Sequence, residues 1–441
     1  MTQEIIEKPL NVDQEKASEA FFEFLLSKDK YMRIVGPGGV GKTFLMGYLI
    51  DRIIPEYRLA MEAIGKTPQL YEVHMTATTN KAAGVLAKST GRPCSTIHSL
   101  LSLRVQNNWS TGEVRLVRSK KWQILRDAII FVDEASMTPR ALLQEIDQST
   151  MNCKIIFVGD HCQLNPVKEA VSEVFTNTYR SAALTIPVRT DKPELLALNQ
   201  QLRDTVEKGI WKPIQEIPGV IDWIRNEEQL ATEVDNHFIL QETNSRIIAY
   251  KNDTVNDLNA YIREQRGKPA YFQEGDNLVS NSAFTRKAAN GMSESLSIEE
   301  EVSITEMDDE IITKIIGGLE MDFFRVTLET EFYVMENVLI PTDNAYFNEC
   351  VKYFAREKRW ADHFGLIENY PELRPKDACT GHKSQGSTYD TVFLDMTDLS
   401  ICRNPEEAAR LFYVAVSRAR NRVVMYGELS KKYGGIIPCS K

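Results

Sequence analysis

Short apolar runs alternate with amphipathic stretches along the first part of the chain. Four runs have the length of buried strands: Tyr31–Val35, Val73–Ala77, Ala128–Val132 and Lys154–Val158. Apolar residues at helical spacing predict helices over three further stretches: 13–29, Thr43–Ile54 and Lys81–Ser89. Because strands that alternate with helices form parallel sheets covered on both faces, this region predicts an α/β lobe.

The pattern changes in the second half and then returns. A second lobe begins after about residue 185, with a strand at Arg246–Tyr250 and a helix at Thr254–Arg266. Residues 270–340 are rich in β-branched and aromatic side chains and predict a small β-barrel, followed by one charged helix over Asn344–His363. The α/β pattern then resumes in four segments: Lys376–Thr380, Thr391–Asp395, Pro405–Arg418 and Val423–Tyr426. The β-rich block is therefore predicted to be an insertion within the second lobe.

The segment Leu103–Trp122 interrupts the first lobe. Apolar and polar residues alternate on either side of 108–113, where Gly112 stands, and this predicts a β-hairpin. Two interpretations stay open: a surface excursion without a role, or a projection with a function of its own.

Composition limits the classes of function. The net charge of −10 argues against a protein that coats nucleic acid through bulk positive charge, although it leaves room for a narrow basic groove. The seven Cys and six His are scattered without a CxxC pair, which argues against a zinc site and for a reducing compartment. No apolar run approaches the roughly 20 residues that span a bilayer, and the N-terminus is polar. We therefore expect a cytoplasmic protein without a membrane partner.

The strongest chemical signal is the sequence GPGGVGKT at Gly36–Thr43, which follows a predicted strand and opens a predicted helix. Glycines allow backbone N–H groups to surround phosphate oxygens, and the positive end of the helix dipole favours the same anion. Lys42 is expected to reach the β- and γ-phosphates, and Thr43 to ligate Mg²⁺. The loop therefore predicts an ATP site.

A second signal is the pair Asp133 and Glu134 at the end of an apolar strand. Asp133 is expected to hold Mg²⁺, and Glu134 to accept a proton from the attacking water. After the next strand, Gln163 is a candidate sensor of the γ-phosphate. Arg189 and Arg418 are candidates for stabilising the charge that develops during phosphoryl transfer. Together these residues favour hydrolysis over nucleotide binding alone.

In order along the chain, the motifs resemble those of superfamily 1 helicases. The phosphate loop resembles motif I and the Asp133–Glu134 pair motif II. The other matches are NVDQE around Gln14 (Q motif), TATTNKAA from Thr76 (Ia), STIHSLL from Ser95 (Ib), GDHCQLNPV from Gly159 (III), Arg189 (IV), TGHKSQG from Thr380 (V) and YVAVSRAR from Tyr413 (VI). Within the superfamily, STIHSLL and HKSQGSTYD are similar to the RecD/Dda branch, called 1B, and the compact layout is similar to phage members of that branch.

The resemblance implies two RecA-like P-loop domains with parallel sheets. The expected ranges are 1–184 for domain 1A, with a hairpin insertion 1B at about 102–123, then 185–266 and 376–441 for domain 2A, and 267–375 for an SH3-like insertion 2B with a helical segment. It also implies an ATP site closed by both lobes, with Mg²⁺. The ATP-binding residues it implies are Gln14, Gly36, Pro37, Gly38, Gly39, Val40, Gly41, Lys42, Thr43, Gln385 and Gly386.

The same resemblance implies partners and direction. Single-stranded and forked DNA are the expected substrates, held without base readout because hydroxyls and amides grip phosphates. The DNA-binding residues are expected to be Thr78, Thr79, Asn80, Thr96, His98, Trp109, Trp360, Thr380 and His382. Trp109 is a candidate separation wedge, and Trp360 is expected to stack on a base, to brace the wedge or to belong to the core.

Three functions remain open from the sequence. The first is a 5′→3′ DNA helicase of replication, recombination or repair, acting as a monomer beside replication or single-strand-binding proteins. The second is a DNA-stimulated ATPase that remodels protein–DNA complexes with little unwinding. The third, a regulatory nucleotide-binding module, is disfavoured by the full set of Glu134, Gln163, Arg189 and Arg418.

Overall fold

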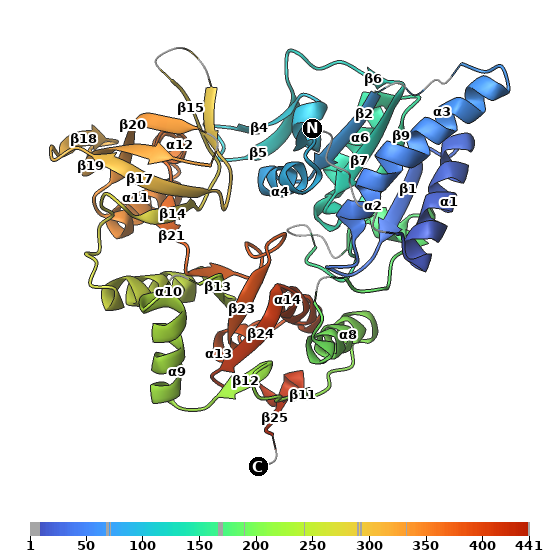
Figure 1. Cartoon of the computed structure of the whole chain (residues 1–441). Coiled ribbons are helices and arrows are strands. Elements are labelled where there is room, and N and C mark those ends of the chain that lie inside the picture. The colour runs from blue at the N-terminus through green and yellow to red at the C-terminus, as the bar shows by residue number, and fades with distance from the viewer. Residues whose placement is uncertain are drawn as a thin grey trace, which may run out of the picture. The chain divides into compact units, whose positions relative to one another are not determined.

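The computed structural model describes residues 9–67, 70, 72–165, 171–188, 190–241, 243–288, 291, 293–331 and 333–439 (Figure 1). The chain divides into two compact units. The first contains the chain up to Leu103, Arg118–Lys212 and Asn404–Asn421; the second contains Arg104–Val117, Pro213–Arg403 and Arg422–Lys441. Within the described residues, none of the helices combines the length and apolar character that crossing a bilayer requires.

A six-stranded sheet forms the centre of the first unit, and its described strands pair in parallel. Its order is β10 (Arg180–Ala183), β1 (Tyr31–Val35), β9 (Lys154–Gly159), β7 (Ala128–Asp133), β2 (Glu72–Ala77) and β3 (Cys94–Thr96). The four apolar runs of the sequence are the four middle strands. This confirms the prediction of a parallel sheet, because strands buried on both faces must be apolar throughout.

Helices accompany this sheet within the first unit. They are α1 (Val12–Leu26), α2 (Lys42–Tyr48), α3 (Ile54–Ala63), α4 (Asn80–Thr90), α5 (Ile97–Leu100), α6 (Arg140–Ser149), α7 (Glu173–Thr176), α8 (Pro193–Lys208) and α14 (Pro405–Ser417). A π-helical turn at Leu49–Ile53 joins α2 to α3, so this helical segment extends beyond the predicted end at Ile54. The apolar faces of α1, α2 and α3 pack against β1, β7 and β9 in one core.

The second unit contains a five-stranded sheet in the order β12 (Ile221–Ile224), β24 (Ala419–Tyr426), β23 (Tyr389–Asp395), β13 (Ser245–Ala249) and β22 (Ala378–Thr380). Strand β12 pairs in parallel with β24, and β13 pairs in parallel with β22 and β23. Helices α9 (Glu227–Val234), α10 (Asn252–Gln265) and α13 (Met396–Leu399) accompany it. The second α/β pattern of the sequence is therefore confirmed.

The β-rich block forms an antiparallel sheet. Its order is β18 (Ile312–Ile316), β19 (Leu319–Glu329), β17 (Glu301–Met307), β14 (Asn277–Ser280) and β21 (Leu373–Pro375), with β20 (Val334–Pro341) also paired to β19. A hairpin, β15 (Phe284–Lys287) and β16 (Ser293–Leu296), lies beside it in sequence. Over the described strands the pairing is an open path, and the SH3-like assignment stays a prediction.

The charged segment after this sheet is two helices where the sequence predicted one. Helix α11 (Asn344–Arg356) ends before Lys358, which adopts a left-handed φ of 56°, and α12 (Trp360–Asn369) then begins. Both helices contribute to one apolar cluster with β19. The periodicity continued across the break because the apolar residues on both sides of it face the same core.

Candidate functional site

The phosphate loop connects β1 to α2 in the way its sequence requires. The Gly36 N–H donates to the Gly159 carbonyl at 3.1 Å, which ties the loop to the neighbouring strand. Gly39 and Gly41 have φ of 83° and 81°, a region that side-chain-bearing residues avoid. A Cβ at Gly36 would collide with the backbone carbonyl of Leu184. Glycine is thus required by backbone geometry as well as by access to phosphate.

Lys42 lies within this loop. Its ammonium donates to the carbonyls of Gly36 at 2.8 Å and Pro37 at 2.9 Å. Thr43 is half-buried on the first turn of α2, and Val40 is buried in the core beneath the loop. The loop is therefore anchored from below by an apolar side chain, while its lysine and threonine stand at the start of the helix.

Asp133 and Glu134 lie at the carboxyl end of β7. Burial and then the neighbouring charge of Glu134 raise the pKa of Asp133, whereas Lys42 acts to lower it. Glu134 has a left-handed φ of 51°, which turns the chain sharply after the strand. A hydroxyl and a carboxylate are the oxygen ligands that Mg²⁺ prefers, and a cation would relieve the crowding of negative charge. Thr43 and Asp133 therefore fit the expected Mg²⁺ site.

Gln14 lies against the phosphate loop. It is 4% exposed, and its side-chain oxygen accepts from the Asn11 N–H at 3.1 Å in a capping box at the start of α1. Its amide nitrogen donates to the Val40 carbonyl at 3.5 Å. A Cβ on Gly41 would lie 2.7 Å from that nitrogen. The capping box thus positions the amide beside the loop, where the resemblance to the Q motif expects an adenine contact.

A buried ion pair network holds the segment after β9, and the sequence did not reveal it. Asp160 is fully buried; Arg203 of α8 donates to one of its oxygens at 2.6 Å, and Tyr413 of α14 donates to the other at 2.6 Å. Burial raises the pKa of Tyr413 well above its usual value, and the Asp160 charge adds to this shift, so the phenol stays a donor. Arg410 of α14 donates to the Gln163 carbonyl at 2.8 Å. Motif III and the helix of motif VI are therefore joined within the first unit.

Gln163 and Arg418, two predicted catalytic residues, are both buried in the first unit. Gln163 is 3% exposed and Arg418 is 2% exposed. The guanidinium of Arg418 donates to the Val414 carbonyl at 3.1 Å and to the Ser417 hydroxyl at 2.8 Å, at the end of α14. The third, Arg189, lies outside the described residues. The catalytic roles of all three stay predictions.

The residues of motifs Ia and Ib follow β2 and β3 at the same sheet edge. The Thr79 hydroxyl accepts from the Ala82 N–H at 3.2 Å and caps α4, and the Thr96 hydroxyl accepts from the Ser99 N–H at 3.1 Å and caps α5. Thr79 is exposed, as the DNA prediction requires, and so is Asn80.

Thr78 differs from its neighbours. It is 8% exposed, and its hydroxyl donates to the Glu134 carbonyl at 3.4 Å. Burial of the Thr78 side chain disfavours a direct contact with DNA. Its hydroxyl contacts the backbone of Glu134, the predicted catalytic base. His98 is half-buried, and burial lowers its pKa, so it is neutral near pH 7.

Motif V forms a turn after β22 in the second unit. Thr380 is buried and accepts through its hydroxyl from the Lys383 N–H at 3.4 Å, whereas His382 is exposed. Gln385 and Gly386 close the turn, and Gly386 has a φ of 79°. Of the two predicted DNA residues here, His382 is the accessible one.

The predicted hairpin exists, and it packs against α12. Strands β4 (Leu103–Asn107) and β5 (Val114–Arg118) pair, and Trp109 is 47% exposed at the turn. A Cβ on Gly112 would lie 2.5 Å from the indole of Trp360, so the turn rests directly on that ring. Asn107 donates to Glu368 at 2.8 Å. The sequence placed this hairpin with the first lobe; by its contacts, Arg104–Val117 belongs to the second unit.

The contact division also differs from the predicted boundaries elsewhere. Helix α8, placed in domain 2A by the sequence, belongs to the first unit, and so does α14. The reason is the Asp160 network, which attaches both helices to β9.

Asp160, His161 and Cys162 place three ligand-type atoms within 4.8 Å of one another. The sequence shows no metal-ligand spacing at these adjacent residues. Asp160 is already bound by Arg203 and Tyr413. Burial also raises the pKa of the Cys162 thiol, so the thiolate that metals bind is disfavoured.

Comparisons with known proteins agree with this arrangement. A family model described as an AAA domain matches residues 9–214, and one described as a UvrD-like helicase C-terminal domain matches residues 377–426. The ATP-dependent DNA helicase Dda of Enterobacteria phage T4 is 24% identical over 93% of this chain and 98% of that protein. An uncharacterized protein of Acanthamoeba polyphaga mimivirus is 22% identical over 94% of this chain and 99% of that protein.

A solved structure shares the fold. The Pif1 helicase from Bacteroides, in complex with ADP-AlF3 and ssDNA, matches with a TM-score of 0.54 at 18% identity, over 98% of this chain and 95% of that chain. Its likeness agrees with two α/β units built on parallel sheets. Both family matches lie in sequence order with the phosphate loop and the Asp133–Glu134 pair, and together with the likeness to Dda they support an ATP-hydrolysing helicase that resembles superfamily 1B.

Proposed function

We propose that this protein is a DNA helicase that uses ATP and Mg²⁺ to move along single-stranded DNA in the 5′→3′ direction and to open forked duplexes. The direction, and roles in replication, recombination or repair, rest on the likeness to superfamily 1B. The proposal includes a monomer that acts beside replication or single-strand-binding proteins.

One observation carries the proposal: residues expected to bind ATP and residues expected to bind DNA lie at a single edge of one parallel sheet. Lys42 and Thr43 follow β1, Asp133 ends β7 and Glu134 follows it. Thr79 follows β2 and caps α4, and Thr96 ends β3 and caps α5. Carboxyl ends of parallel strands meet at one edge, where such sheets bind their ligands. Phosphates of ATP and phosphates of a strand can therefore be held side by side, as a motor requires.

Thr78 supplies a physical connection between the two. It donates to the backbone of Glu134, and the next residue, Thr79, caps the exposed start of α4. A strand phosphate bound at α4 would therefore act one residue away from the loop that orients the general base. Bound Mg²⁺ would neutralise phosphate charge, while Glu134 would take the proton of the attacking water.

The hairpin supports unwinding. Its turn exposes Trp109, and Gly112 seats the turn on the half-buried Trp360 ring. Trp360 also contacts His363 and Phe364, with ring centroids 5.7 Å and 6.2 Å away. A hairpin turn that is held by a neighbouring side chain can insert an aromatic ring between base pairs without being displaced. We therefore propose that Trp109 is the separation wedge and that Trp360 holds the hairpin in place.

Polarity and unwinding are tested with one pair of substrates. Duplexes of identical sequence carry either a 5′ or a 3′ single-stranded tail, and strand separation is followed with ATP and Mg²⁺. We expect separation with the 5′ tail only. Separation with the 3′ tail alone contradicts the direction. DNA-stimulated hydrolysis without separation on either substrate would favour the alternative, an ATPase that remodels protein–DNA complexes.

A further inference from the structure

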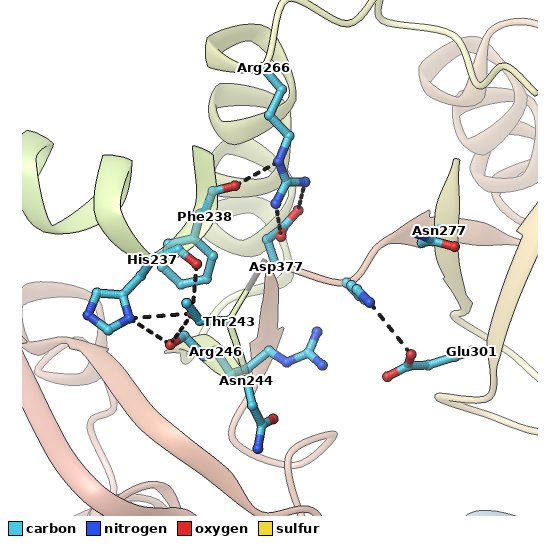
Figure 2. Close-up of a pocket in the computed structure, with 11 residues that line it drawn as sticks. His237, Phe238, Thr243, Asn244, Arg246, Arg266, Asn277, Glu301 and Asp377 are labelled. Carbon is cyan, nitrogen blue, oxygen red and sulfur yellow. Dashed lines mark hydrogen bonds and ion pairs between the residues drawn. The ribbon is translucent and has the colours of Figure 1, made fainter. Parts of the chain in front are cut away.

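The second unit contains a cavity of about 440 Å³ at the amino-terminal edge of its parallel sheet (Figure 2). Ser245, the first residue of β13, and Asp377, which precedes β22, line it. Asn277 of β14 and Glu301 of β17 line it from the antiparallel sheet. Motif V follows the opposite end of β22, so the cavity is separate from the site described above.

Arg246 is the unusual residue of this cavity. It is only 8% exposed, yet within the described part of the chain its Nε and Nη1 are buried without a hydrogen-bond acceptor. Its guanidinium lies over the ring of Tyr389, 4.8 Å from the centroid. Figure 2 shows the side chain extending into the space between the Arg266–Asp377 pair and Glu301, with no dashed line reaching it.

The other two long cations that line the cavity each face a carboxylate. Arg266 donates to both oxygens of Asp377, at 2.8 Å and 2.7 Å. Lys376 lies 3.7 Å from Glu301. Of the three long cationic side chains that line the cavity, Arg246 is therefore the one that forms no ion pair with another lining residue.

A second buried arginine of the same unit, Arg263, has the hydrogen-bond acceptors that Arg246 lacks. Arg263 is 7% exposed and lies 5.4 Å from the ring centroid of Phe272, much as Arg246 lies over Tyr389. Arg263, however, is bound by Asp276 at 2.7 Å and by the Tyr271 carbonyl at 2.6 Å. An aromatic face alone thus does not replace hydrogen-bond acceptors for a buried guanidinium in this protein.

A buried charge without acceptors destabilises a fold unless a ligand completes it. We propose that this cavity binds a phosphate group, with the Nε and Nη1 of Arg246 donating to two of its oxygens. The guanidinium fork matches two phosphate oxygens. Lys376 and Arg266 also line the cavity, although Glu301 and Asp377 offset their charges. The volume lies in the range of small-molecule sites, so the phosphate is that of a free small molecule or of a nucleic-acid backbone. The inference goes beyond the proposed helicase function and does not depend on it.

Pyrophosphate is the probe, and the full-length chain carries Lys42→Ala so that the phosphate loop does not compete. Titration calorimetry at constant ionic strength should show binding, and adding Arg246→Met should weaken it by about tenfold to a hundredfold. Arg246→Lys, which keeps the charge and loses the fork, should fall between. Equal affinity with and without Arg246→Met, or no binding to the Lys42→Ala chain, overturns the proposal.

Thermal unfolding separates this role from a structural one. Without phosphate, Arg246→Met should leave the unfolding temperature unchanged or raise it, because an uncompensated charge is replaced by an apolar chain of similar length. Arg263→Met should lower it. With pyrophosphate, the Lys42→Ala chain should be stabilised and its Arg246→Met derivative should not. A loss of stability in Arg246→Met equal to that in Arg263→Met, without phosphate, contradicts the proposal.

A competition experiment identifies the source of the phosphate. A single-stranded oligonucleotide is added to the Lys42→Ala chain saturated with pyrophosphate. Displacement that requires Arg246 identifies a nucleic-acid backbone as the ligand, and retention of pyrophosphate identifies a free phosphate compound. Either result supports a phosphate site.

Discussion

Gly112→Ala tests whether the hairpin acts as a braced wedge. Gly112 has a φ of 75°, and its N–H donates to the Asn108 carbonyl at 2.8 Å. A side chain in this backbone region costs about 1–2 kcal/mol. The added methyl would also lie 2.5 Å from the Trp360 ring, where ordinary contact begins at 3.4 Å. The turn and the indole must therefore move apart by about 1 Å, and the hairpin loses its contact with the Trp360 ring.

The expected result is a selective loss. Strand separation of a forked duplex should slow by up to about tenfold, the factor that corresponds to 1.4 kcal/mol of lost docking. ATP hydrolysis stimulated by single-stranded DNA should stay unchanged, because Gly112 lies outside the nucleotide site. Both are measured on the same preparation, by a fluorescent fork and by phosphate release.

Gly318→Ala is the matched control. Gly318 lies in a hairpin turn of the same unit with a φ of 82°, and no atom lies within 4 Å of the Cβ position. It suffers the backbone strain alone and should unwind at the parent rate. In a Trp360→Ala background, Gly112→Ala should reduce the unwinding rate little further, because both substitutions remove the same contact between the turn and the indole. An unwinding rate for Gly112→Ala equal to that of Gly318→Ala would refute the brace.

Three further predictions concern the first unit. Glu134→Gln should bind ATP with near-parental affinity but lose steady-state hydrolysis by at least about a hundredfold; full turnover would remove Glu134 from its role. Thr78→Val should leave basal hydrolysis unchanged. Its stimulation by single-stranded DNA should fall by about twofold to tenfold, which corresponds to the loss of one hydrogen bond. Equal loss of the basal and stimulated rates in a phosphate-release assay would argue against a connection between the start of α4 and Glu134 through Thr78. Tyr413→Phe removes a donor from the buried Asp160 carboxylate and should destabilise the fold by about 1.5–3 kcal/mol, seen in calorimetry as a fall of several degrees. An unchanged unfolding temperature would show that Arg203 and the Cys162 N–H satisfy Asp160 without the phenol.

The four middle strands of the first sheet were predictable from local pattern. The run at Tyr31–Val35 coincides with β1, and the helix predicted at Lys81–Ser89 is α4 with one more residue at each end. Apolar periodicity indicates which residues of a short segment are buried. Because strands and helices are such short segments, the periodicity predicts them. The phosphate loop and the Asp133–Glu134 pair were equally readable, because each is a short sequence whose chemistry depends on the strand directly before it.

Tertiary structure alone decided which distant residues meet. Asp160 and Tyr413 are separated by 253 positions, and no local pattern indicates that their side chains bond. The seat of Gly112 on Trp360 and the lack of an acceptor for Arg246 depend in the same way on the packing of separate elements. By itself, the sequence indicated the buried strands and the phosphate loop, since both arise from neighbours in the chain. Burial and long-range contacts, which decide what a side chain touches, required the folded structure.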